Sequence, residues 1–256
     1  MDTSVGLLSS LLCLLLWCLG LLGLGAFGVF LVWLFRRVRQ ADRAPVSAAE
    51  QEKMQAEVDA LMSKVRPWRR EALADLQATR QVRWMSFGRR ARVRGLIAAS
   101  RSDAERTWAA FALRGRRVYG RPISFEGRAH VRTTAQSFDF EAQPTDLISI
   151  QVDHEPLGSI HPDGTLLDPS GQPIGQFPPH PANDQATYPV TLHGRVVARL
   201  RNLYHGGLFS FRRQPRPPAV EIIAPDLTLE ERDWLLALAL WQVVNLAGRQ
   251  VETGGV

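Results

Sequence analysis

The residues with the clearest chemistry in this chain are arginines, and seven of them stand in two short runs. The first run is Arg36, Arg37 and Arg39, and the second is Arg89, Arg90, Arg92 and Arg94. Positive charge of this density attracts anionic phospholipid, at about 1 kcal/mol per basic residue near the surface. The two runs therefore predict basic residues that face an anionic membrane surface.

The charge of the whole chain is unevenly placed around these runs. Residues 36–132 hold 23 Lys and Arg against 10 Asp and Glu, a net charge of +13. Residues 133–256 hold 8 against 14, a net charge of −6. Only two of the 31 basic residues are lysines, so a genome biased towards arginine is an alternative explanation of the runs. Nucleic acid is not expected as a partner.

Other chemistry-bearing residues do not form a recognisable site. The six histidines are scattered, none pairs with another at i, i+4 on an expected helix, and no cysteine lies near them. Asp163 and Asp168 resemble calcium ligands, but the spacing of an EF-hand loop is missing and turn chemistry explains both. The nucleophile elbow and the phosphate-binding and dinucleotide-binding glycine motifs are absent. We predict no catalytic, metal-binding or cofactor-binding residue and no cofactor.

The first 40 residues predict a membrane anchor. Gly6–Phe35 is a run of 30 uncharged, mostly apolar residues, and a spanning helix needs about 20. Asp2 precedes the run and the first arginine run follows it, which predicts a C-terminal domain in the cytoplasm. A cleaved signal peptide fits less well because the apolar stretch is too long. The expected structure is one helix over about 7–35, in a single-pass protein of the inner or plasma membrane.

Residues 41–81 predict a short helical linker beside the membrane. Ser47 and Glu50 form a capping box, and a second helical stretch is expected over 68–81. One apolar stripe follows the box, made of Met54, Val58, Leu61 and Val65. The stripe over 47–66 has two interpretations. It is either a contact between molecules, as a self-associating stalk or the docking face for another protein, or a helix that packs on its own domain. The second is favoured because the stripe is short.

Residues 82–250 predict a mainly β domain, followed by a tail at 251–256. The expected strands are Val93–Ala98, Arg117–Phe125, Arg128–Thr133, Ser137–Glu141, Leu147–Val152, a meander of three short strands over 156–177, Arg195–Arg201, Leu208–Phe211 and Val220–Ile223. Asp163-Gly164 and His193-Gly194 predict hairpin turns, because both central positions of such turns need positive φ. Arg101–Leu113 is expected to be helical because Ser102 and Glu105 form another capping box.

The last element is a helix that begins after the capping box of Thr228 and Glu231. Between Trp234 and Ala247 it is apolar on all sides, and at 1.5 Å per residue it is too short to span a bilayer. Such a helix must be buried within protein. Its expected core residues are Trp234, Leu235, Leu236, Leu238, Leu240, Trp241 and Val244. Short strands with one buried helix predict an antiparallel barrel around that helix.

The second half of the chain resembles the tubby C-terminal-like superfamily, which includes phospholipid scramblases and LURP-one-related proteins. The resemblance rests on the turn repeat over 158–175, on Arg195–Leu200, and on Val220–Ile223 leading into Trp234–Val244. It covers 156–247, and 83–155 only loosely. It implies a closed antiparallel barrel around a hydrophobic helix. The calcium-ligand loop and cysteine clusters of scramblases are missing, so an activity does not follow from it.

These observations give three hypotheses for function. The first is a membrane-anchored cytoplasmic domain that binds lipid or anionic headgroups, or acts as a membrane-associated adaptor. The second is a protein-interaction scaffold of an envelope assembly, with 47–66 as its contact. The third is an enzyme whose site shows no motif.

Overall fold

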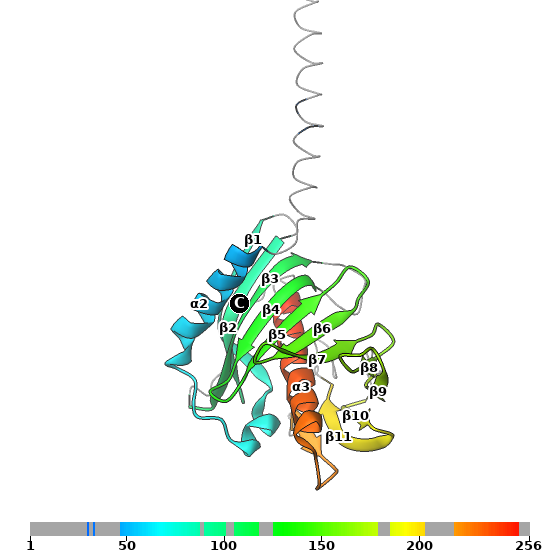
Figure 1. Cartoon of the computed structure of the whole chain (residues 1–256). Coiled ribbons are helices and arrows are strands. Elements are labelled where there is room, and N and C mark those ends of the chain that lie inside the picture. The colour runs from blue at the N-terminus through cyan, green and yellow to red at the C-terminus, as the bar shows by residue number, and fades with distance from the viewer. Residues whose placement is uncertain are drawn as a thin grey trace, which may run out of the picture. The chain divides into compact units, whose positions relative to one another are not determined.

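The structure is a computed structural model that describes residues 30, 33, 47–87, 90–100, 105–117, 125–178, 185–202 and 218–250. Pro45–Val256 form one compact unit. In this unit helix α2 (Ala48–Met62) comes first, followed by a short 3-10 helix, η1 (Arg70–Asp75), the strands, and helix α3 (Leu229–Gln250) (Figure 1). Residues Arg36, Arg37, Arg39 and Arg89 lie outside the described residues.

The described strands form one antiparallel sheet in which each strand pairs with the next along the chain. They are β1 (Ala78–Phe87), β2 (Arg90–Ala98), β3 (Thr107–Arg117), β4 (Phe125–Arg132), β5 (Ser137–Ala142), β6 (Ile148–Val152), β7 (Glu155–Ile160), β8 (Thr165–Leu167), β9 (Pro173–Gln176), β10 (Thr187–Leu192), β11 (Arg195–Arg201) and β12 (Val220–Ile222). The turn at His193-Gly194 has positive φ at both residues, 50° and 76°, as the sequence predicts for the hairpin of β10 and β11.

The predicted closed barrel is wrong, because the sheet is open. Within the described residues β1 pairs only with β2, and β12 pairs only with β11. A meander closes only when its two end strands bond to each other. Instead, η1 lies beside β12, where the Ala219 N–H donates to the Ala74 carbonyl oxygen at 2.8 Å.

The predicted membrane span also needs correction. In the part of the chain that the structure describes, no helix has the length and apolar character needed to cross a membrane. The single-pass architecture and the localisation in the inner or plasma membrane are therefore not supported. Of residues 7–35, only Phe30 and Trp33 are among the described residues.

Strand β3 is buried on both of its faces, and this explains a second wrong prediction. Trp108, Phe111 and Leu113 belong to the main core, whereas Ala110 and Ala112 contact α2 in a separate cluster. A strand covered on both sides has a continuous apolar run, which periodicity does not distinguish from a helix. The helix expected over 101–113 is therefore strand from Thr107, and residues 101–104 lie outside the described residues.

The linker predicted over 41–81 belongs to the folded unit where it is described. The capping box of α2 is present, with the Glu50 N–H donating to Ser47 Oγ at 3.3 Å. Met54 and Val58 are buried against the sheet, which confirms that the stripe packs on its own domain. The second helix expected over 68–81 is wrong, because η1 ends at Asp75 and β1 begins at Ala78.

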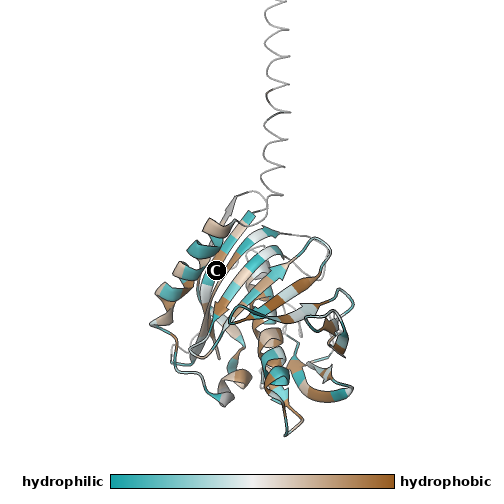
Figure 2. Cartoon of the chain, in the orientation of Figure 1, coloured by the Kyte–Doolittle hydropathy of each residue, from teal (hydrophilic) through white to brown (hydrophobic). Residues whose placement is uncertain are grey.

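Helix α3 lies against the inner face of the sheet, where it packs on β1 to β4, β7 and β11. The hydropathy colours show apolar residues along the helix and alternating character along several strands (Figure 2). The seven core residues expected on α3 are all buried: Trp234, Leu235, Leu236, Leu238, Leu240, Trp241 and Val244. Phe140 of β5 packs on Trp241 with ring centroids 5.4 Å apart.

Replacing Leu240 by Asp tests the role of α3 in the core. Leu240 is fully buried, so Leu240→Asp places an unpaired charge in the core and should lower the free energy of unfolding by more than about 4 kcal/mol. Leu229→Asp is the matched control, because Leu229 on the same helix is 77% exposed. Denaturant unfolding measures both. Similar stabilities for the two variants would contradict the burial of α3.

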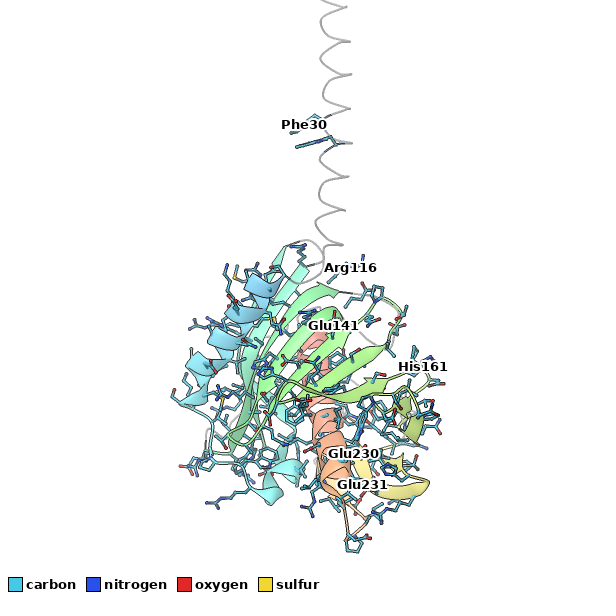
Figure 3. All side chains as sticks on the ribbon, viewed as in Figure 1. Phe30, Arg116, Glu141, His161, Glu230 and Glu231 are labelled. Carbon is cyan, nitrogen blue, oxygen red and sulfur yellow. The ribbon has the colours of Figure 1, made fainter. Side chains whose placement is uncertain are left out.

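The start of α3 is held by a buried carboxylate. Glu231 completes the capping box, since the Thr228 N–H donates to Glu231 Oε2 at 2.9 Å. Arg195 of β11 donates to the same carboxylate, with Nη2 3.0 Å from Oε2. Glu231 lies beside Glu230 at the lower end of the helix in Figure 3. Burial by itself raises the pKa of the Glu231 carboxyl, but the bonds from Arg195 and Thr228 outweigh it, so the net pKa is lowered.

A lowered pKa makes this contact sensitive to acid. The stabilisation from Glu231 is complete above its unfolded pKa of about 4.5 and is lost as the pH falls through its lower folded value. Glu231→Gln should cost about 1–3 kcal/mol at neutral pH and should flatten the loss of stability below pH 4.5. The control is Glu230→Gln, one position away and exposed. Unfolding curves over a pH series test this, and equal acid sensitivity of the two variants would contradict it.

Candidate anion-binding site

Seven arginines from three neighbouring strands lie on the outer surface of the sheet, and we call this surface the arginine face. It is made of Arg90, Arg92 and Arg94 on β2, Arg114 and Arg116 on β3, and Arg128 and Arg132 on β4. The local cause is the period of two in a strand. On β2, the intervening residues Ala91 and Val93 are buried on the inner side of the strand.

The strand register places three of these arginines side by side. Arg92 is opposite Arg114, and Arg114 is opposite Arg128 on the other side. Arg90 and Arg116 form the next opposite pair. Like charges directly opposite each other destabilise a sheet unless negative charge compensates them. Among the described residues of the sheet, the row of three reaches a carboxylate only at Glu141 of β5, 3.2 Å from Arg128 Nη2.

Helix α2, on the outer side of the sheet, supplies acceptor oxygens that compensate part of this positive charge. Glu50 Oε1 lies 3.5 Å from Arg92 Nη2, and Gln51 Oε1 accepts from Arg128 Nη1 at 2.6 Å. Asp59 accepts from Arg132. These arginines lie on two different strands, β2 and β4, and all of their partners lie on α2. The helix therefore connects β2 and β4 across the arginine face.

Arg114 lies under α2 at the centre of the row and is incompletely bonded. Its side chain is 5% exposed, and Nη2 donates to Glu57 Oε1 at 2.9 Å. The Nε and Nη1 atoms are buried and have no hydrogen-bond partner. A buried donor without a partner costs stability, and a guanidinium has a fork of donors that matches phosphate or carboxylate oxygens. Arg114 thus has two guanidinium donors that Glu57 does not satisfy.

A polar cavity of about 370 Å³ borders the arginine face. Arg132 and Asp59 line it, together with His130, which is almost fully buried. His130 Nδ1 is 2.8 Å from Asp139 Oδ1 on the neighbouring strand, a contact that fixes the orientation of the ring. A histidine held in this way can exchange a proton or bond an anionic oxygen.

Asp163 and Asp168 are occupied by their own turns, as the sequence indicates. The Asp163 carboxylate accepts from the Thr165 N–H, a bond that lowers its pKa to about 2. The Asp168 carboxylate accepts from Ser170, and this hydrogen bond lowers its pKa. In the described part of the chain, no group of three His, Cys, Asp or Glu side chains is placed to hold a metal ion.

The structure brings only part of the predicted basic residues together. Arg90, Arg92 and Arg94 share the arginine face, while the other four lie outside the described residues. Sequence reasoning missed Arg114, Arg116, Arg128 and Arg132, although each pair is spaced to share a strand face. The missing information was the register, which alone shows that Arg114 is opposite Arg92. Arg116 of β3 and Glu141 of β5 are labelled on the sheet in Figure 3.

Comparison of the chain with protein-family models, with curated proteins and with solved structures finds no match.

The unpartnered donors predict an unusual effect on stability. Arg114→Met removes two unsatisfied buried donors and leaves Glu57 partly exposed, so it should raise the free energy of unfolding by about 1–3 kcal/mol. Arg116→Met is the matched control on the same strand. Arg116 Nε donates to Glu126 Oε2 at 3.0 Å, so its loss should lower stability by a similar amount. Denaturant unfolding measures both variants. If both are destabilised, the interpretation that Arg114 has unsatisfied buried donors is contradicted.

Proposed function

We propose that the protein is a binding module for phosphate-bearing anions, of the kind carried by anionic phospholipid headgroups, with the arginine face as its site. The observation that carries the proposal is Arg114, whose Nε and Nη1 have no partner although the side chain is buried. The row that it forms with Arg92 and Arg128 supports a ligand with several anionic oxygens.

The chemistry of phosphate suits this row better than that of a single carboxylate. A phosphate group offers several acceptor oxygens arranged in three dimensions, and the three arginines extend from three neighbouring strands of the sheet. Charge-assisted bonds from guanidinium to phosphate are about twice as strong as neutral ones. His130 in the neighbouring cavity lies on β4 together with Arg128 and adds a further nitrogen at the edge of the arginine face.

The alternatives have less support from the described residues. The apolar stripe of α2 is used within the fold, so it does not favour the scaffold hypothesis. His130 Nδ1 lies 2.8 Å from Asp139 Oδ1, but the hydroxyls of Thr133 and Ser137 in the same cavity donate to the Gln136 carbonyl oxygen and Asp153 Oδ1 and not to this histidine, so an enzyme has less support. The resemblance to the tubby-like superfamily stays a prediction.

Binding to two phosphate probes tests the proposal. Residues 45–256 should bind inositol hexakisphosphate and vesicles that contain phosphatidylserine, and should bind phosphatidylcholine vesicles poorly. Affinity should fall as salt is added, because screening weakens contacts between charges. Calorimetry and vesicle co-sedimentation measure the two arms. Competition between the soluble probe and the vesicles shows that both use one site.

A charge-matched pair of variants locates the site. Arg92→Gln with Arg128→Gln should weaken binding at least about tenfold, by loss of two charge-assisted contacts. Arg199→Gln with Arg232→Gln removes the same charge from β11 and α3 and should change it little. Equal losses in both double variants, or equal binding to neutral and anionic vesicles, would contradict the proposal.

A further inference from the structure

The polar residues of α2 occupy the positions where an anion would contact the arginine face. Glu50 and Glu57 are seven residues apart, two turns along one side of the helix, and reach Arg92 and Arg114. Gln51 reaches Arg128 from the same side. Three oxygen-bearing side chains thus present oxygens to the row of three arginines, as the phosphates of a ligand would.

The attachment of α2 to the sheet is limited. Of its apolar residues Met54 and Val58 are fully buried and Leu61 and Met62 are partly buried, all in a small cluster separate from the main core around α3. The pair of Arg92 and Glu50 is solvent-exposed, and such pairs contribute little to stability. Its other contacts with the sheet are the polar ones to Arg114, Arg128 and Arg132, and after the helix the Arg66 N–H donates to the Thr107 carbonyl oxygen at 2.9 Å. Release of α2 would therefore expose Leu96, Ala110 and Ala112, while the separate core around α3 does not depend on contacts with α2.

We infer that α2 is an intramolecular competitor for the anion site, a helix that a phosphate-bearing ligand must displace to reach Arg114. The inference rests on the proposed function and adds its regulation. Phosphate takes the place of the Glu57 carboxylate on Nη2 and satisfies Nε and Nη1, which α2 leaves without partners. The apparent affinity then depends on the fraction of molecules in which α2 is released.

Weakening the contact of α2 tests the inference in the whole chain. Glu57→Gln should tighten binding of inositol hexakisphosphate about tenfold, because it raises the released fraction. Glu52→Gln is the matched control: Glu52 is on the same helix, carries the same charge and is exposed. It should change affinity less than about twofold. Equal affinities of the two variants would overturn the competitor role.

Hydrogen exchange of the unmodified chain gives a second readout that does not depend on a variant. Adding inositol hexakisphosphate should speed exchange of the amides of α2 and leave those of α3 unchanged. Slower exchange in α2 would show that the ligand binds over a docked helix and would overturn the inference. If neither the unmodified chain nor Glu57→Gln binds the probe at low salt, the proposed function itself fails, which is a different result from binding without displacement.

Discussion

Strand β3 is buried on both faces, and this double burial brings one long helix to each side of the sheet. Its inner side chains, Phe111 and Leu113, pack in the core around α3, and its outer alanines contact α2. The sheet needs a cover on each side at this strand, and the chain provides one helix for each. Arg114 follows directly in the same strand, so the cover that α2 provides for the alanines also encloses an arginine.

The sequence was sufficient for elements whose signals are local. The capping boxes of Ser47 and Thr228 mark the starts of both long helices, and the apolar character of α3 on all sides requires its burial. Long-range pairing was not accessible. The all-apolar stretch in β3 has no period, and closure of a sheet depends on whether its end strands meet, which no local pattern encodes. The complete arginine face was not predicted for the same reason, since only the strand register places Arg92, Arg114 and Arg128 in one row.

The features of the arginine face that would bind an anion also lower the stability of the fold. A row of like charges is unfavourable in a sheet, and buried donors without partners add to the cost. Proteins retain such features where activity needs them, and stability is then lower than the fold allows. Helix α2 reduces the cost by contributing carboxylate and amide oxygens, yet it leaves two atoms of Arg114 unbonded. The same contacts therefore reduce charge repulsion on the arginine face in the absence of ligand. They also determine the free energy needed to displace α2 when a ligand binds.

The side-chain resonance of Arg114 reports directly on whether the arginine face binds phosphate. The Nε–H signals of the arginines can be followed by nuclear magnetic resonance while inositol hexakisphosphate is added at low salt. We expect the signal of Arg114 to shift and saturate together with those of Arg92 and Arg128, while that of Arg199 on β11 stays in place. Saturable binding that leaves the Arg114 signal unchanged would contradict it.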